Sequence, residues 1–133
     1  MTGEAKYASY NLLVVDDHRT MLQIVQGLLR QIGFINIDTA MDGLQALAHM
    51  EKKRYDLIIS DWNMPNMDGL EFLKHVRSSP NNQVKAVPFI MVTAETKSQN
   101  IVAAKQAGVN NYIIKPLALA TLKQKIDSTL GIM

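Results

Sequence analysis

The sequence contains no cysteine, which excludes disulfide bonds and thiolate metal sites. An excess of charge of one sign is also missing: 14 Lys and Arg stand against 12 Asp and Glu, and a net charge of +2 does not predict nucleic acid as a partner. No apolar run approaches the length that spans a bilayer, and the polar N-terminus has no signal-peptide core, so we expect no membrane association. These features favour a cytoplasmic protein.

The length and composition favour one globular domain. A chain of 133 residues can bury a real core, and 47% hydrophobic with 20% charged residues is typical of a folded protein. We predict a short N-terminal extension over residues 1–10 and a single domain over residues 11–133. No linker, low-complexity segment or solenoid-length repeat interrupts the chain, so we expect no second domain.

Short apolar runs alternate with amphipathic helical patterns along the chain. Continuously apolar runs favour strands covered on both faces, as in a parallel sheet, and they occupy residues 12–15, 57–59, 89–92 and 112–114. An alternating stretch at residues 34–40 predicts a fifth strand nearer an edge. Helices are predicted around residues 21–32, 44–48, 70–76, 101–105 and 119–130, and residues 78–83 (SSPNNQ) are predicted to form a loop. Five βα units with right-handed crossovers predict a three-layer α/β fold.

Polar residues follow most of the predicted strands. In open α/β sheets, ligands bind at the carboxyl ends of the strands, so we expect three acids, one hydroxyl and one ammonium to meet at one rim: Asp16, Asp17, Asp61, Thr93 and Lys115. Each has an ordinary explanation, such as a helix cap or a solvated charge. Together they are harder to explain, because converging carboxylates destabilise one another's ionised form and Lys115 offsets only one of them.

A hard divalent cation would satisfy the remaining charge. Mg²⁺ prefers oxygen ligands and usually takes one or two carboxylates together with phosphate oxygens. The rim therefore predicts a Mg²⁺ site that receives a phosphoryl group. A carboxylate can attack phosphorus to give an aspartyl-phosphate, with metal, lysine and hydroxyl stabilising the equatorial oxygens. Asp61, on the central strand, is best placed to be that nucleophile.

Four segments resemble the receiver domain of two-component response regulators in order and spacing over essentially the whole chain. They are VVDD at residues 14–17, SDWNMPNMDGLEFL at 60–73, VTAE at 92–95 and YIIKP at 112–116. Among receivers, the second segment, the stretch QAGVNNYIIKP and ATLKQKI are similar to the CheY-like chemotaxis regulators. The resemblance implies a flavodoxin-like fold with sheet order 2-1-3-4-5 and a monomeric single receiver without an output domain.

The resemblance also implies the residues that hold the metal. Asp61 corresponds to the phosphoacceptor, and Asp17 and Asp61 correspond to the carboxylate ligands of Mg²⁺. The backbone carbonyl of Asn63 corresponds to a third protein ligand, and Asp16 to the acid that reaches the metal through water. The bond between Lys115 and Pro116 is implied to be cis, which X–Pro chemistry permits.

Other positions correspond to switching and lifetime residues. Thr93 is implied to turn toward the phosphoryl group, Lys115 to pair with it and Tyr112 to follow Thr93. Asn63 and Glu95 match positions that tune the lifetime of the phosphate. The chain is thereby implied to be a signalling phosphoacceptor, which assists its own phosphorylation and dephosphorylation and is no enzyme for an external substrate.

The implied output surface is formed by the predicted helix at residues 101–105, the strand at 112–114 and the last helix. Lys97, Tyr112 and Lys125 match its positions, although a solvated face explains the two lysines equally well. The implied partners are a CheA-like sensor histidine kinase and a FliM-like flagellar motor switch protein.

Several features leave the partner open. His18 and Arg19 directly follow the acid pair, and Leu117 stands where many relatives carry Phe, near the switching surface. An FMN carrier fits poorly because DDHR presents two carboxylates where hydroxyls and amides are needed. A haloacid-dehalogenase-type phosphatase needs an acid where Asn63 stands. A receiver that shuttles phosphate between kinases, acts as a phosphate sink or regulates a kinase stays open.

Overall fold

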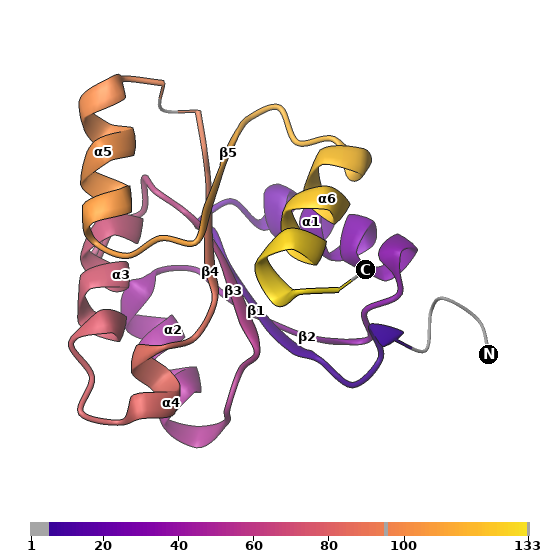
Figure 1. Cartoon of the computed structure of the whole chain (residues 1–133), viewed down its shortest axis with the longest axis horizontal. Coiled ribbons are helices and arrows are strands. Elements are labelled where there is room, and N and C mark those ends of the chain that lie inside the picture. The colour runs from indigo at the N-terminus through magenta and orange to yellow at the C-terminus, as the bar shows by residue number, and fades with distance from the viewer. Residues whose placement is uncertain (1–5, 95, 133) are drawn as a thin grey trace.

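The computed structural model describes residues 6–94 and 96–132, and its centre is a five-stranded parallel sheet (Figure 1). The sheet order is β2-β1-β3-β4-β5, as the receiver resemblance implied. The strands are β1 (Asn11–Val15), β2 (Asn36–Ala40), β3 (Leu57–Asp61), β4 (Phe89–Thr93) and β5 (Asn111–Ile114). The carboxyl ends of all five strands therefore lie at one edge of the sheet.

Helices cover both faces of the sheet, which confirms the three-layer α/β fold. One face is covered by α1 (Arg19–Ile32) and α6 (Leu119–Leu130). The other is covered by α2 (Gly43–Lys52), α3 (Gly69–Arg77) and α5 (Ser98–Gln106), with the short α4 (Asn82–Lys85) beside them (Figure 1). No helix among the described residues is both long and apolar enough to cross a membrane.

The continuous apolar runs follow from this double cover. Successive side chains of a strand point to opposite faces, so Leu12 and Val14 pack with α1 and α6 while Leu13 and Val15 pack with α2 and α3. All four are buried. The edge strand β2 is less apolar because only Ala40 among its residues is fully buried.

Two local predictions differ from the structure. Residues 82 and 83 were predicted to be loop but begin α4, because the side chain of Asn81 accepts hydrogen bonds from the backbone N–H groups of Gln83 and Val84 and caps the helix. In α2 the predicted apolar marker Leu44 is 53% exposed, whereas Ala46 is fully buried. The small side chain of Ala46 lets α2 pack closely in the core that it shares with α3.

The guanidinium of Arg77, at the end of α3, joins three segments that are separate in the sequence. It donates to the backbone carbonyls of Lys85 (2.9 Å), the last residue of α4, and of Val87 (2.7 Å), two residues before β4. It also donates to the carbonyl of Gly108 (2.9 and 3.0 Å) and to Asn110 Oδ1 (2.9 Å) before β5. Burial lowers the pKa of this guanidinium below its ordinary value. The clamp fixes the end of the sheet opposite the polar rim.

Part of the predicted N-terminal extension packs on the domain. Tyr7 is 2% exposed, and its ring makes an edge contact with Phe34 at a centroid distance of 4.9 Å. Its hydroxyl donates to Asp127 Oδ1 of α6 over 3.0 Å. Tyr7 therefore ties the segment just before β1 to the last helix.

Candidate functional site

The polar residues predicted at the strand ends lie together at the carboxyl edge of the sheet. Asp16 directly follows β1, Asp61 ends β3, Thr93 ends β4 and Lys115 directly follows β5. Asp16, Asp61 and Thr93 are at most 6% exposed. Parallel pairing produces this convergence, because it aligns the ends of β1, β3, β4 and β5 in register.

One ammonium group lies between two of the carboxylates. Lys115 Nζ lies 3.3 Å from Asp61 Oδ1 and 3.7 Å from Asp16 Oδ2. The pKa of Asp61 is nevertheless raised above its ordinary value, first by burial and then by the negative charge of Asp16. Lys115 and the backbone N–H of Trp62 oppose that rise. The site therefore holds more negative charge than its own lysine neutralises.

The acidic cluster suits a divalent cation. Asp16, Asp17, His18 and Asp61 each offer one ligand atom, and these four atoms lie within 4.8 Å of one another. Asp17 Oδ1 is buried and accepts no hydrogen bond, which is costly for a carboxylate unless something else satisfies it. Hard oxygen donors with one unsatisfied atom fit the donor set that Mg²⁺ prefers.

The sequence did not reveal how closely His18 approaches the acids. Its Nδ1 lies 3.1 Å from Asp16 Oδ1 and 3.1 Å from Asp17 Oδ1. Its backbone N–H donates to Asp16 Oδ1 over 2.9 Å, which directs the residue back over the pair. The position of His18 directly after two acids was the only signal in the sequence for this contact. The direction of its ring could not be predicted, because it depends on the turn that precedes α1.

The loop after Asp61 is held by contacts with α2 and with its own end. Asn66, with a left-handed φ of 66°, donates its side-chain N–H to Asp42 Oδ2 over 2.8 Å. The backbone N–H of Gly69 donates to the Trp62 carbonyl over 2.7 Å. Asp68 caps α3 with Glu71 in a reciprocal capping box. The side chain of Asn63 is exposed in this loop, two residues after Asp61.

Replacing Asp42 by Ala is expected to lower the free energy of unfolding at neutral pH and to remove the part of its pH dependence that comes from this carboxyl. Hydrogen bonds from the Gln45 backbone and the Asn66 side chain hold the pKa of the Asp42 carboxyl below its ordinary value of 3.8. Its stabilisation is therefore present above pH 3.8 and lost as pH falls through the lower pKa of the folded state. Urea denaturation should show Asp42→Ala less stable than wild type by about 1–2 kcal/mol at neutral pH, from the lost helix cap and loop contact.

The difference in free energy of unfolding between wild type and Asp42→Ala should become smaller in acid. Asp42→Asn serves as the control, because its amide keeps an acceptor for the Gln45 N–H and does not titrate. A gap between wild type and Asp42→Ala that stays constant down to strongly acid pH would contradict this account.

The expected switch residues lie beside the acidic rim. The backbone N–H of Lys115 donates to the Thr93 carbonyl over 2.8 Å, and the following bond to Pro116 is cis, as the resemblance implied. The ring of Tyr112 is half-buried and meets the ring of Trp62 edge-on at a centroid distance of 6.4 Å. Sequence reasoning missed this contact, which connects the loop after Asp61 to β5.

The proposed partner residues are spread around β5. Lys97 is exposed just before α5, Lys125 is half-buried on α6, and Tyr112 lies on β5 between these two helices (Figure 1). Leu117 is half-buried and packs with the cluster under α1 and α6. Glu95, expected to tune phosphate lifetime, lies outside the described residues.

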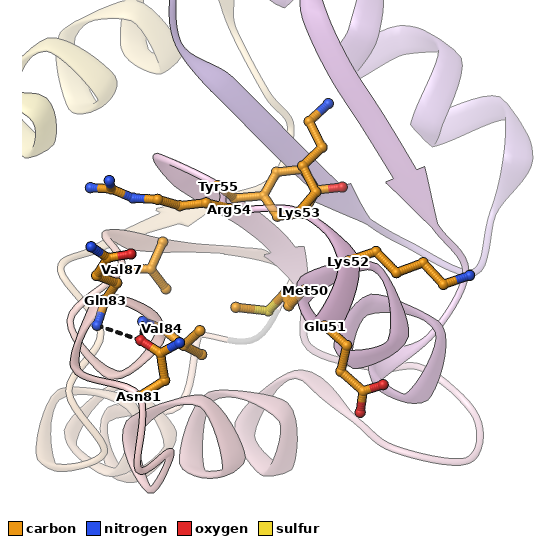
Figure 2. Close-up of a pocket in the computed structure, with 10 residues that line it drawn as sticks. All are labelled: Met50, Glu51, Lys52, Lys53, Arg54, Tyr55, Asn81, Gln83, Val84 and Val87. Atoms are coloured by element: carbon orange, nitrogen blue, oxygen red, sulfur yellow. Dashed lines mark hydrogen bonds between the residues drawn. The ribbon is translucent and has the colours of Figure 1, made fainter.

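A pocket of about 230 Å³ lies at the opposite end of the sheet (Figure 2). Tyr55 and Val87, which precede β3 and β4, contribute to its lining together with Met50 and Val84. In Figure 2 the side chains of Lys52 and Lys53 extend away from it. Glu51 and Arg54 also contribute to its lining, and the pocket shares no residue with the acidic rim, from which it is therefore separate.

Comparison with known proteins assigns the family. The family model "Response regulator receiver domain" matches residues 12–127. The chemotaxis protein CheY-3 of Vibrio cholerae is 48% identical over 116 residues, covering 87% of this chain and 88% of that protein. The solved chemotaxis response regulator CheY4 of Vibrio cholerae superposes with a TM-score of 0.82 at 38% identity, over 91% of this chain and 98% of that one.

A second solved structure contains the expected metal. The receiver domain of sensor histidine kinase PA1611 from Pseudomonas aeruginosa has a magnesium ion coordinated in its active site cleft. It superposes with a TM-score of 0.83 at 29% identity, over 93% of this chain and 99% of that one. The fold, the strand-end residues and these similarities together establish that the chain belongs to the response regulator receiver domain family and is homologous to its CheY-type chemotaxis proteins.

Proposed function

We propose that this chain is a single-domain response regulator that a histidine kinase phosphorylates on Asp61 in a Mg²⁺-dependent reaction. The observation that carries the proposal is the position of the Asp61 carboxylate, buried at the end of the central strand with Lys115 Nζ 3.3 Å away. The same carboxylate adjoins Asp16 and Asp17 in the acidic cluster. A buried acid with a raised pKa and a single lysine is poorly explained by a structural role alone.

The chemistry follows from the groups around Asp61. An Asp61 carboxylate oxygen attacks the phosphorus of a phosphohistidine, an O–P bond forms, and the P–N bond breaks with its electron pair left on the imidazole. Lys115 pairs with the phosphoryl oxygens as negative charge accumulates, and the Thr93 hydroxyl turns toward them. When bound, Mg²⁺ would neutralise charge on those oxygens, held by Asp16, Asp17, Asp61 and the Asn63 carbonyl.

Switching requires an element that the new charge can bias. A phosphoryl group adds roughly −1.5 to −2 charges, which attracts Lys115 and Thr93 toward Asp61. We infer that Tyr112 follows Thr93 and changes its edge contact with Trp62, since that contact joins β5 to the acceptor loop. The change would reach the surface formed by α5, β5 and α6, where Lys97, Tyr112 and Lys125 lie.

Replacing Asp17 by Asn is expected to weaken Mg²⁺ binding. The buried and unsatisfied Asp17 Oδ1 is one of the atoms that would bind the ion, and an amide carries no charge to offer. Titration of Mg²⁺ while recording Trp62 fluorescence should show a dissociation constant raised at least about tenfold. Asp56→Asn is the matched control, because Asp56 accepts from the Asn11 backbone N–H at the other end of the sheet. Equal titrations for Asp17→Asn and wild type would remove Asp17 from the site.

The output is proposed to be the flagellar motor switch, through a FliM-like protein and downstream of a CheA-like kinase. This rests on the homology to chemotaxis proteins. The alternative is a receiver that acts as a phosphorelay shuttle, phosphate sink or kinase regulator. Pull-downs with acetyl-phosphate-treated wild type and Asp61→Asn separate these two functions. Recovery of the motor protein by phosphorylated wild type, and not by Asp61→Asn, favours the motor switch. Recovery only of kinases or phosphotransfer proteins favours the phosphorelay alternative.

Further parts of the proposal come from the sequence. Asn63 and Glu95 are proposed to set the phosphate lifetime, and the chain to assist its own phosphorylation and dephosphorylation. The single receiver domain over residues 11–133, the monomeric state and the cytoplasmic location stay predictions.

A further inference from the structure

We propose that His18 supplies an imidazole ligand to the acidic site, so that the site binds a divalent first-row transition cation such as Ni²⁺ more tightly than Mg²⁺. The inference rests on the metal site of the proposed function and concerns which cation that site takes. It follows from the position of a histidine directly after the two acids.

The distance of the His18 ring from each of the two acids is that of neighbouring ligands around one ion. His18 Nδ1 lies 3.1 Å from Asp16 Oδ1 and 3.1 Å from Asp17 Oδ1. Adjacent ligands of an octahedral cation with bonds of about 2.1 Å are about 3.0 Å apart, because the edge of an octahedron is √2 times its radius. The nitrogen thus already lies at the distance from each of the two oxygens that a shared ion requires.

Hydrogen bonding alone accounts for only part of this arrangement. His18 Nδ1 has hydrogen-bond geometry toward Asp16 Oδ1, but the equally close Asp17 Oδ1 is buried and accepts no hydrogen bond. A cation touching all three atoms would satisfy it. The bond from the His18 backbone N–H to Asp16 Oδ1 holds the residue over the acids without using the ring.

Ligand chemistry then decides the cation. Carboxylate, carbonyl and water oxygens suit Mg²⁺, whereas an imidazole nitrogen favours borderline metals such as Ni²⁺, Zn²⁺ and Cu²⁺. Affinity at a mixed nitrogen and oxygen site also rises along the first row toward Cu²⁺. Adding His18 to Asp16, Asp17 and Asp61 turns an all-oxygen site into a mixed one. Mg²⁺ would gain little from the ring, since it keeps water in that position.

The test is a pair of titrations on the full chain at neutral pH, one with Ni²⁺ and one with Mg²⁺, followed by Trp62 fluorescence and by calorimetry. His18→Phe is expected to weaken Ni²⁺ binding at least about tenfold, the loss typical of removing a group that supports a metal. Mg²⁺ affinity should stay within about twofold, because its oxygen ligands remain. The His18 side chain is 69% exposed, so its replacement should not unfold the protein.

His75→Phe is the matched control for adventitious Ni²⁺ binding to surface histidine. His75 is exposed on α3 and its Nδ1 lies 3.1 Å from the Glu71 carbonyl oxygen. This variant should bind both ions like wild type. Ni²⁺ should also produce hyperfine-shifted imidazole proton signals in the NMR spectrum of wild type and His75→Phe, and these should be missing in His18→Phe.

The outcomes separate this inference from the proposed function. Unchanged or tighter Ni²⁺ binding by His18→Phe, with normal Mg²⁺ binding, would overturn the role of His18 and leave the Mg²⁺ site intact. An equal loss of both ions in His18→Phe would overturn the claim of selectivity. Wild type that binds neither ion would overturn this inference and also the metal step of the proposed function.

Discussion

Asp61→Asn is expected to abolish labelling of the chain by acetyl phosphate in the presence of Mg²⁺. An amide oxygen carries no negative charge and is a poor nucleophile toward phosphorus, so no O–P bond should form. Asp16 adjoins Asp61 but is tied to the His18 backbone N–H and lies farther from Lys115, at 3.7 Å against 3.3 Å. Incorporation of radioactive phosphate, or the mass of the intact protein, measures the loss.

The Asp61 variant should remain folded, which makes the loss of labelling interpretable. Burial and the charge of Asp16 raise the pKa of Asp61, so its ionised form costs folding free energy as pH rises above its ordinary pKa. Removing that charge should leave the free energy of unfolding at neutral pH unchanged or higher. Asp56→Asn, the same substitution at the other end of the sheet, should label like wild type. Undiminished labelling of Asp61→Asn would contradict the assignment.

Gly69→Ala is expected to lower the free energy of unfolding by about 3 kcal/mol, at the upper end of the usual cost of overpacking. A Cβ at Gly69 would collide with the backbone carbonyl oxygen of Asp61, and would lie 2.9 Å from Trp62 Cα and 2.9 Å from the Met91 sulfur. Two of these atoms are backbone and cannot rotate away. The acceptor loop would have to shift, so phosphorylation of Asp61 should slow as well.

Gly27→Ala is the matched control for this prediction. Gly27 is exposed in the middle of α1, and an added Cβ would meet nothing within 4 Å. Alanine there should raise stability by about 0.5–1 kcal/mol, because glycine costs a helix more backbone entropy. Urea denaturation measures both variants, and acetyl phosphate labelling measures the acceptor. If Gly69→Ala has the stability and the labelling rate of wild type, the close approach of Gly69 to the Asp61 backbone does not require glycine, and the prediction is contradicted.

The fold was predictable because its signals are local. Continuous apolar runs identified the buried strands, and the alternating stretch identified β2 as an edge strand. The strand order came from the resemblance to receivers. The short helix α4 was missed because its apolar contribution is small and its cap, Asn81, lies in a segment rich in loop-forming residues. Local preference cannot separate one helical turn from a turn in a loop.

The site was predictable to the extent that strand ends bring residues together. Asp16 and Lys115 directly follow strands and Asp61 ends one, so a parallel sheet alone places them at one edge. Side-chain direction was not available from spacing, and so the approach of His18 to both acids was missed. The edge contact of Trp62 and Tyr112 joins positions far apart in the chain, and no local pattern indicates it.

The most direct test of the account locates the phosphoryl group. The chain is treated with acetyl phosphate and Mg²⁺ and then reduced with borohydride, which converts an aspartyl-phosphate into homoserine. Peptides are then sequenced by tandem mass spectrometry, with a sample lacking acetyl phosphate as the control. We predict homoserine at position 61 in the phosphorylated sample only, and homoserine at position 16, 17 or another acid, with Asp61 intact, would contradict the account.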